Sequence, residues 1–226
     1  MASSKDDQAT VACVNLMAEQ DVEFYGFHLA RTYYGDQDLW LAFKDKFDDQ
    51  VEQGAAAVPA ASARVMDRLR AKFLFRFADD KAYDGHTPQE VAAAFQIFED
   101  EDDEGEDVTV EDMTLDDDNE ESEDEDENED AQSNPEDGGP GIVRSLCLMV
   151  NKESMRSQNE ATPYVVAVDA MLHTGVDLGY PGYFKVAISA LMPHLYAAVA
   201  RHSLEDVAAA VDQDGIWRRM PSPDAQ

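Results

Sequence analysis

Before Glu99, apolar side chains recur mostly at intervals of three and four residues, the spacing of amphipathic helices. The clearest helix start is Thr87-Pro88-Gln89-Glu90, where a capping hydroxyl, a proline and a glutamate form a capping box. The predicted helices span residues 7–34, where one long or two short helices fit, 36–53, 60–78 and 87–98. Together they predict an N-terminal helical lobe over residues 1–98.

Residues 142–220 show a second set of apolar patterns. The apolar run from Ile142 to Val150 fits a short buried strand or a helix, and its periodicity does not separate the two. Further predicted helices span residues 162–173, 183–201 and 203–215, and the last of these opens on Ser203-Leu204-Glu205-Asp206, a pattern typical of a helix cap. Pro193 is expected to kink or break the helix over residues 183–201 near residues 189–193. The pattern therefore predicts an all-α fold of two small helical lobes, residues 1–98 and 142–220.

A strongly acidic segment separates the two predicted lobes at residues 99–141. Between Glu99 and Asp130, 22 of 32 residues are Asp or Glu and none is Lys, Arg or His, so this run carries −22 of the chain's net charge of −32. Like charges at this density repel one another, and the run offers too little apolar surface to offset the entropy of ordering. We therefore expect a disordered linker that meets water, cations or a basic partner.

The charge density of the run approaches that of a phosphate backbone, which indicates a polyanion that competes for basic surfaces. This predicts an acidic interaction protein that binds a basic protein, in particular a nucleic-acid-binding one, and inhibits or chaperones it. The alternative is a structural or assembly protein, such as a scaffold or virion component, with a solvated acidic spacer. The candidate partner-binding residues are Glu99, Asp100, Asp102, Asp103, Glu104, Asp116, Asp117, Asp118, Glu120, Glu121, Glu123, Asp124, Glu125, Asp126 and Glu127.

Two narrower interpretations of the acidic run also remain open. Asp100, Asp102, Glu104, Gly105 and Glu111 match part of a calcium-binding EF-hand loop, but no paired second loop is present. Acids three residues after Thr109, Thr114 and Ser122 are typical of sites for acidophilic kinases.

A basic stripe is predicted on the helix over residues 60–78. Arg64, Arg68, Lys72 and Arg76 recur every four residues and would form one continuous positive face. We expect this stripe to attract the protein's own acidic segment and so partly to mask the acids from a basic partner. A direct contact with nucleic acid is the alternative for the stripe.

Signatures of enzymes are weak. Asp169 and His173 are four residues apart in a predicted helix, with His194 and His202 further on, but no phosphate-binding loop, dinucleotide turn, nucleophile elbow or CxxC pair is present. The expectation is a non-enzymatic protein with no catalytic residues, metal or cofactor. Cys13 and Cys147 both lie in apolar surroundings and are expected to be buried free thiols.

The overall charge also bears on partners and location. An acidic chain is repelled by anionic lipid and by nucleic acid, so direct binding to a membrane or to nucleic acid is not expected. The N-terminal residues lack a signal-peptide pattern, which predicts a cytoplasmic, nuclear or intravirion protein rather than a secreted one. The sequence leaves the oligomeric state open.

Overall fold

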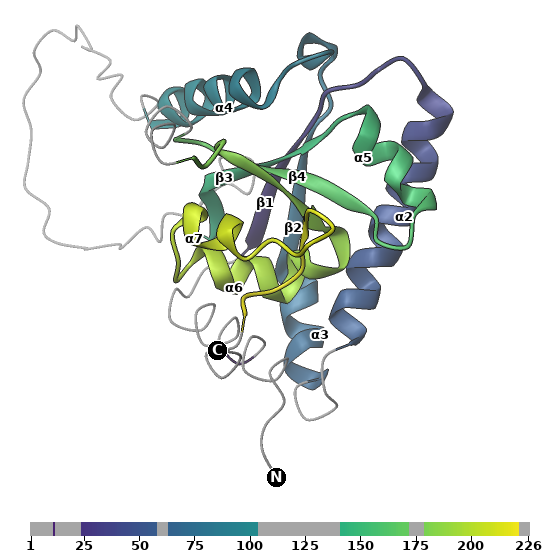
Figure 1. The fold of residues 1–226 in the computed structure, drawn as a ribbon, viewed down its shortest axis with the longest axis vertical. Coiled ribbons are helices and arrows are strands. Elements are labelled where there is room, and N and C mark those ends of the chain that lie inside the picture. Colours follow the sequence, from purple (N-terminus) through teal and green to yellow (C-terminus); the bar gives the residue numbers. More distant parts are fainter. Residues whose placement is uncertain (1–10, 12–23, 58–62, 104–140, 172–178, 222–226) are drawn as a thin grey trace, which may run out of the picture.

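A six-stranded mixed β-sheet with helices on both faces forms the protein (Figure 1). The computed structural model describes residues 11, 24–57, 63–103, 141–171 and 179–221. The strand order is β2-β1-β3-β4-β5-β6; β1 runs parallel to β2 and β3, β4 runs antiparallel to β3 and β5, and β6 runs parallel to β5. The strands are β1 (Tyr25–Arg31), β2 (Phe73–Ala78), β3 (Ile142–Val150), β4 (Tyr164–Asp169), β5 (Tyr183–Ala187) and β6 (Ile216–Trp217).

The connections between the strands are mostly helical. The α-helices are α2 (Gln37–Ala56), α3 (Ala63–Lys72), α4 (Pro88–Asp103), α5 (Lys152–Arg156), α6 (Tyr196–Val199) and α7 (Leu204–Ala209). The short 3-10 and π segments are η1 (Lys81–Tyr83), η2 (Ser157–Asn159), η5 (Ile188–Ala190) and η6 (Leu191–Leu195). Among the helices of the described ranges, none is both long and apolar enough to cross a membrane.

The all-α prediction is wrong, because four stretches predicted as helix contain strands. Residues 25–31 of the predicted helix 7–34 form β1, and residues 73–78 of the predicted helix 60–78 form β2. Similarly, β4 replaces the predicted helix 162–173 over its described part, and β5 occupies the start of the predicted helix 183–201. The ambiguous run at residues 142–150 is a strand. The two segments flanking the acidic run share one sheet, since β1 pairs with β3, so they are not separate helical lobes.

The starts of two helices in the first segment were predicted correctly, but both helices run further than expected, α2 to Ala56 and α4 to Asp103. Helix α2 begins after Asp36, whose carboxylate accepts a hydrogen bond from the backbone N–H of Leu39 at 2.9 Å. Helix α4 begins with the predicted capping box: the Glu90 N–H donates to the Thr87 hydroxyl at 3.3 Å, and the Thr87 N–H donates to the Glu90 carboxylate at 2.7 Å. This hydrogen bond lowers the pKa of Glu90.

The second segment also contains two correctly predicted local features. Ser203 caps α7, accepting from the Asp206 N–H at 3.1 Å, although the helix ends at Ala209, earlier than expected. A break near Pro193 is confirmed, because Met192 has non-helical backbone angles (φ −125°, ψ 127°) between η5 and α6.

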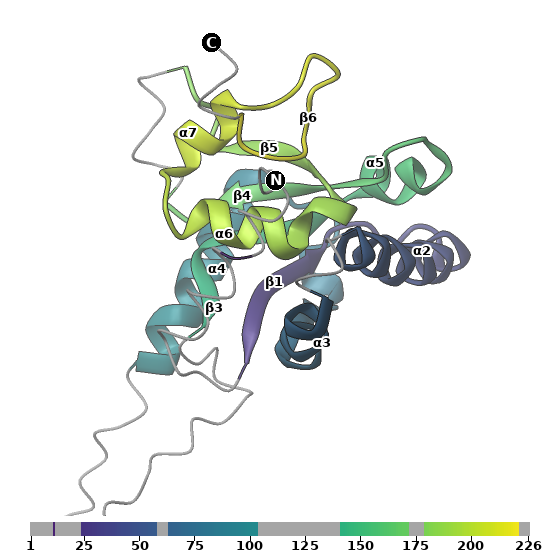
Figure 2. The ribbon, with the colours of Figure 1, turned by 90° about the horizontal axis from the view of Figure 1, so that it is seen from below.

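Two hydrophobic layers enclose the sheet. The larger layer packs α2, α5 and α6 against one face, with Trp40, Phe43 and Phe47 of α2 fully buried in it. The smaller layer lies under α4 on the opposite face and includes Val91, Phe95, Cys147, Met149 and Val166. Figure 2 shows α4 on one side of β1 and β3, with α2 and α3 on the other side. The β1-to-β2 and β2-to-β3 connections therefore cross opposite faces of the sheet.

Candidate functional site

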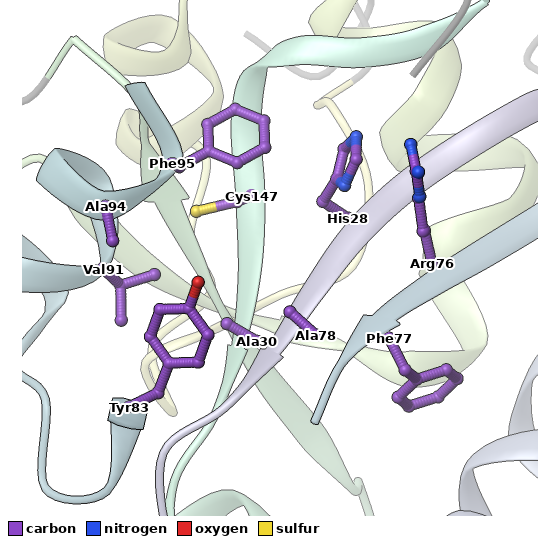
Figure 3. A pocket seen from close by; sticks show the side chains of 10 residues that line it. All are labelled: His28, Ala30, Arg76, Phe77, Ala78, Tyr83, Val91, Ala94, Phe95 and Cys147. Atoms are coloured by element: carbon purple, nitrogen blue, oxygen red, sulfur yellow. The ribbon is translucent and has the colours of Figure 1, made fainter. Parts of the chain in front are cut away.

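A hollow lies on the α4 face of the sheet, beside the helix. Helix α4 packs mainly over β3 and β4, and the neighbouring part of this face, formed by β1 and β2, is open enough to leave a pocket of about 260 Å³ (Figure 3). The pocket is lined by His28, Ala30, Arg76, Phe77, Ala78, Tyr83, Val91, Ala94, Phe95 and Cys147.

The register of two parallel strands forms the floor of this pocket. His28 of β1 is paired with Arg76 of β2, and Ala30 is paired with Ala78 two residues further along. Side chains alternate between the faces of a strand, so all four point to the α4 face. The alanines are small and leave space, while Figure 3 shows His28 and Arg76 side by side at one end.

Helix α4 and the turn before it form the opposite wall. Val91, Ala94 and Phe95 come from α4, and the Phe95 ring meets the His28 ring edge-on with centroids 5.1 Å apart. Tyr83 of η1 is buried, and its hydroxyl points into the hollow in Figure 3. The capping box therefore also fixes where this wall begins, because it sets the first turn of α4.

The titratable groups of the pocket favour binding over thiol chemistry. Burial raises the pKa of the Cys147 thiol to about 12, so the thiol is protonated at neutral pH and is a poor nucleophile. Burial, followed by the nearby carboxylate of Asp80, raises the pKa of Tyr83, which keeps its hydroxyl neutral and able to donate. Within the described part of the chain, Arg76 has neither an ion pair nor a side-chain hydrogen bond.

A second polar cluster lies at the carboxyl ends of β1 and β2, where α/β sheets commonly bind ligands. Arg31 fills this position and is 3% exposed. Its guanidinium donates to the Tyr33 carbonyl at 2.9 Å, to Asp79 at 3.2 Å and to Gln37 at 3.0 Å.

Two aromatic rings complete the surroundings of Arg31. The guanidinium carbon lies 4.1 Å from the ring centre of Tyr34 and 4.7 Å from that of Trp40. Burial, together with Asp79, raises the pKa of Tyr34. The guanidinium N–H groups of Arg31 already donate to Tyr33, Asp79 and Gln37 of the same chain. This cluster is therefore a structural element that joins the ends of β1 and β2.

The candidate residues from the sequence are only partly placed by the structure. Glu99, Asp100, Asp102 and Asp103 fall on the last turns of α4. The remaining candidates, Glu104, Asp116, Asp117, Asp118, Glu120, Glu121, Glu123, Asp124, Glu125, Asp126 and Glu127, lie outside the described residues.

The predicted basic stripe is divided between two elements. Arg64, Arg68 and Lys72 lie on α3, whereas Arg76 lies on β2 and lines the pocket. Helix α3 ends at Lys72, so Arg76 does not continue its face. The proposed attraction between this helix and the acidic segment stays a prediction.

The histidines considered for an enzyme site are not joined to Asp169 on a helix. Asp169 ends β4 and accepts a hydrogen bond from the Met171 N–H at 2.8 Å, while His173 lies outside the described residues. Among the described residues, no three His, Cys, Asp or Glu side chains are grouped in a way that could hold a metal ion.

Comparisons with family models, with curated proteins and with solved structures gave no match to this chain.

Proposed function

We propose that the protein is an acidic interaction protein that binds a basic, nucleic-acid-binding protein and inhibits or chaperones it by polyanion mimicry. One observation carries the proposal: 22 acids in 32 consecutive residues without a single Lys, Arg or His. Such a run gives the electrostatic attraction that a phosphate backbone gives, while the folded domain supplies specificity.

The points where the acidic segment joins the domain support this proposal. The segment begins on the last turns of α4, and it ends at Gly141, directly before β3. The Gly141 carbonyl accepts hydrogen bonds from the Gly26 N–H at 3.3 Å and from the Tyr196 hydroxyl at 2.9 Å. The acids are thus tethered at both ends to one folded unit, and a partner held by them is also brought to its surface.

The proposal is tested by removing charge without changing length. In one variant every Asp and Glu from residue 104 to residue 130 is replaced by Asn or Gln; in the control variant the exposed Asp45, Asp48 and Asp49 of α2 are replaced by Asn. Proteins captured by the wild type are identified and bound to labelled DNA, and each variant is then added as a competitor. We expect the wild type and the α2 control to displace the DNA, and the neutralised variant to fail.

Salt gives the second readout of the same experiment. An interaction carried by the acidic run should weaken about tenfold or more between about 50 mM and about 200 mM salt. If the neutralised variant captures the same proteins with unchanged affinity, polyanion mimicry is wrong. That result would instead favour an assembly protein in which the run is a solvated spacer.

A further inference from the structure

We propose that the pocket between α4 and the β1–β2 part of the sheet binds a small carboxylate with a flat apolar body, and that Arg76 holds the carboxylate. This site is separate from the acidic segment and does not depend on the function proposed for it.

The shape of the pocket sets the size of the ligand. An apolar cavity of about 150 Å³ in another protein is known to hold benzene, so a pocket of about 260 Å³ accommodates a larger ring system. The floor at Ala30 and Ala78 carries only methyl side chains, which leave a low apolar surface, and Val91 and Phe95 form an apolar wall opposite it. A planar aromatic body fits between such surfaces.

The charge of the pocket sets the chemistry of the ligand. Arg76 is half-buried and has no ion pair among the described residues. A guanidinium presents two parallel N–H donors that match a carboxylate, and it is the side chain best suited to this group. The neighbouring His28 and the hydroxyl of Tyr83 add further hydrogen-bonding groups at the same hollow.

The negative charge of the whole chain does not decide binding at this site. The net charge of −32 repels anions at long range, but at physiological salt the screening length is only about 8 Å. Cys147 and Tyr83 add no negative charge, because the pKa values of both are raised, mainly by burial. The carboxylates of Asp80 and Asp169 act on Tyr83 and Cys147 from outside the lining, and none of the lining residues is an Asp or Glu. Arg76 is therefore the lining residue with a permanent charge.

The test compares two ligands that share a naphthalene ring, naphthoate with its carboxylate and naphthalenemethanol with a neutral hydroxymethyl group, by calorimetry on the full chain at about 0.15 M salt. We expect naphthoate to bind about tenfold more tightly than the alcohol, as a charge-assisted hydrogen-bonded pair would give. Arg76→Gln should remove this preference and leave the affinity for the alcohol unchanged. The matched control is Arg70→Gln on α3, which removes an equal charge outside the pocket and should leave the preference intact.

A third measurement locates the ligand without any substitution. Contacts between naphthyl protons and the Val91 methyl groups, measured by nuclear Overhauser effects in the wild type, are expected if the ligand lies in the pocket. Ala94→Leu narrows the pocket from the α4 side and should weaken both ligands. Equal binding of the two ligands by the wild type, an unchanged preference in Arg76→Gln, or contacts only to residues elsewhere would each overturn the proposal.

Discussion

Two arginines on neighbouring strands have opposite surroundings. Arg31, at the end of β1, is buried with Asp79, Gln37 and the Tyr33 carbonyl around its guanidinium. Arg76, in β2, faces the other side of the sheet and lines an open pocket without an ion pair in the described part of the chain. Burying a charge without partners is costly, so Arg31 is a structural residue, whereas half-buried Arg76 is available to a ligand.

Cys147 provides a prediction at the same scale. Its pKa is raised to about 12, which means that the protonated form is favoured and that the reactive thiolate is scarce until the pH approaches that value. In a Cys13→Ser background, we expect Cys147 to resist iodoacetamide near pH 8 in the folded protein and to react readily in denaturant. Mass spectrometry of the alkylated protein measures this. Rapid alkylation of the folded protein would contradict the described burial.

At the scale of elements, capping signals in the sequence were more reliable than hydrophobic periodicity. The caps of α4 and α7 and the break near Pro193 depend on a few adjacent residues and were predicted, whereas the capping role of Asp36 before α2 was not. Strand β2 was missed because Leu69, Phe73 and Phe77 fit a helical spacing of four, while Phe73, Phe75 and Phe77 equally fit the alternation of a strand.

Burial on both faces hid strand β4, and pairing between residues far apart in the sequence hid the pocket. Strand β4 is apolar throughout from Tyr164 to Val168, because α4 covers one of its faces and the larger hydrophobic layer covers the other. The pocket could not be predicted at all, since it depends on the pairing of His28 with Arg76 across a separation of 48 residues. No local pattern reports which strands become neighbours.

The packing of α2 against η5 leads to a prediction at this scale. A Cβ added to Gly54 would lie 2.0 Å from the Ser189 carbonyl oxygen, a backbone atom that cannot rotate away. We expect Gly54→Ala to lower the free energy of unfolding by about 2 kcal/mol, even though alanine is the better helix former. Urea denaturation measures the change, and Gln53→Ala, at an exposed position of the same helix, should stay within about 0.5 kcal/mol of the wild type. A stabilised Gly54→Ala variant would show that α2 and η5 are not in close contact.

At the scale of the whole molecule, the acidic segment interrupts the sequence but not the sheet. Strand β1 lies between β2, which precedes the segment, and β3, which follows it. The fully buried Leu146 and Leu148 of β3 belong to the same hydrophobic layer as Phe27 and Leu29 of β1. The composition change at Glu99 suggested two lobes. The strands before the segment and the strands after it nevertheless bury apolar side chains in the same hydrophobic layer.

This arrangement predicts that the two sides fold together and not alone. Separate fragments of residues 1–103 and 141–226 should each lack a cooperative thermal transition, because each exposes a sheet edge and apolar surface that the other covers. Mixing them should restore the circular dichroism spectrum and the cooperative unfolding of the intact chain. As a control, a first fragment with Gly26→Val should fail to complement, since a Cβ at this position would lie 1.7 Å from the Leu74 carbonyl oxygen of β2. Independent cooperative folding of both fragments would instead restore the two-lobe interpretation and refute the shared sheet.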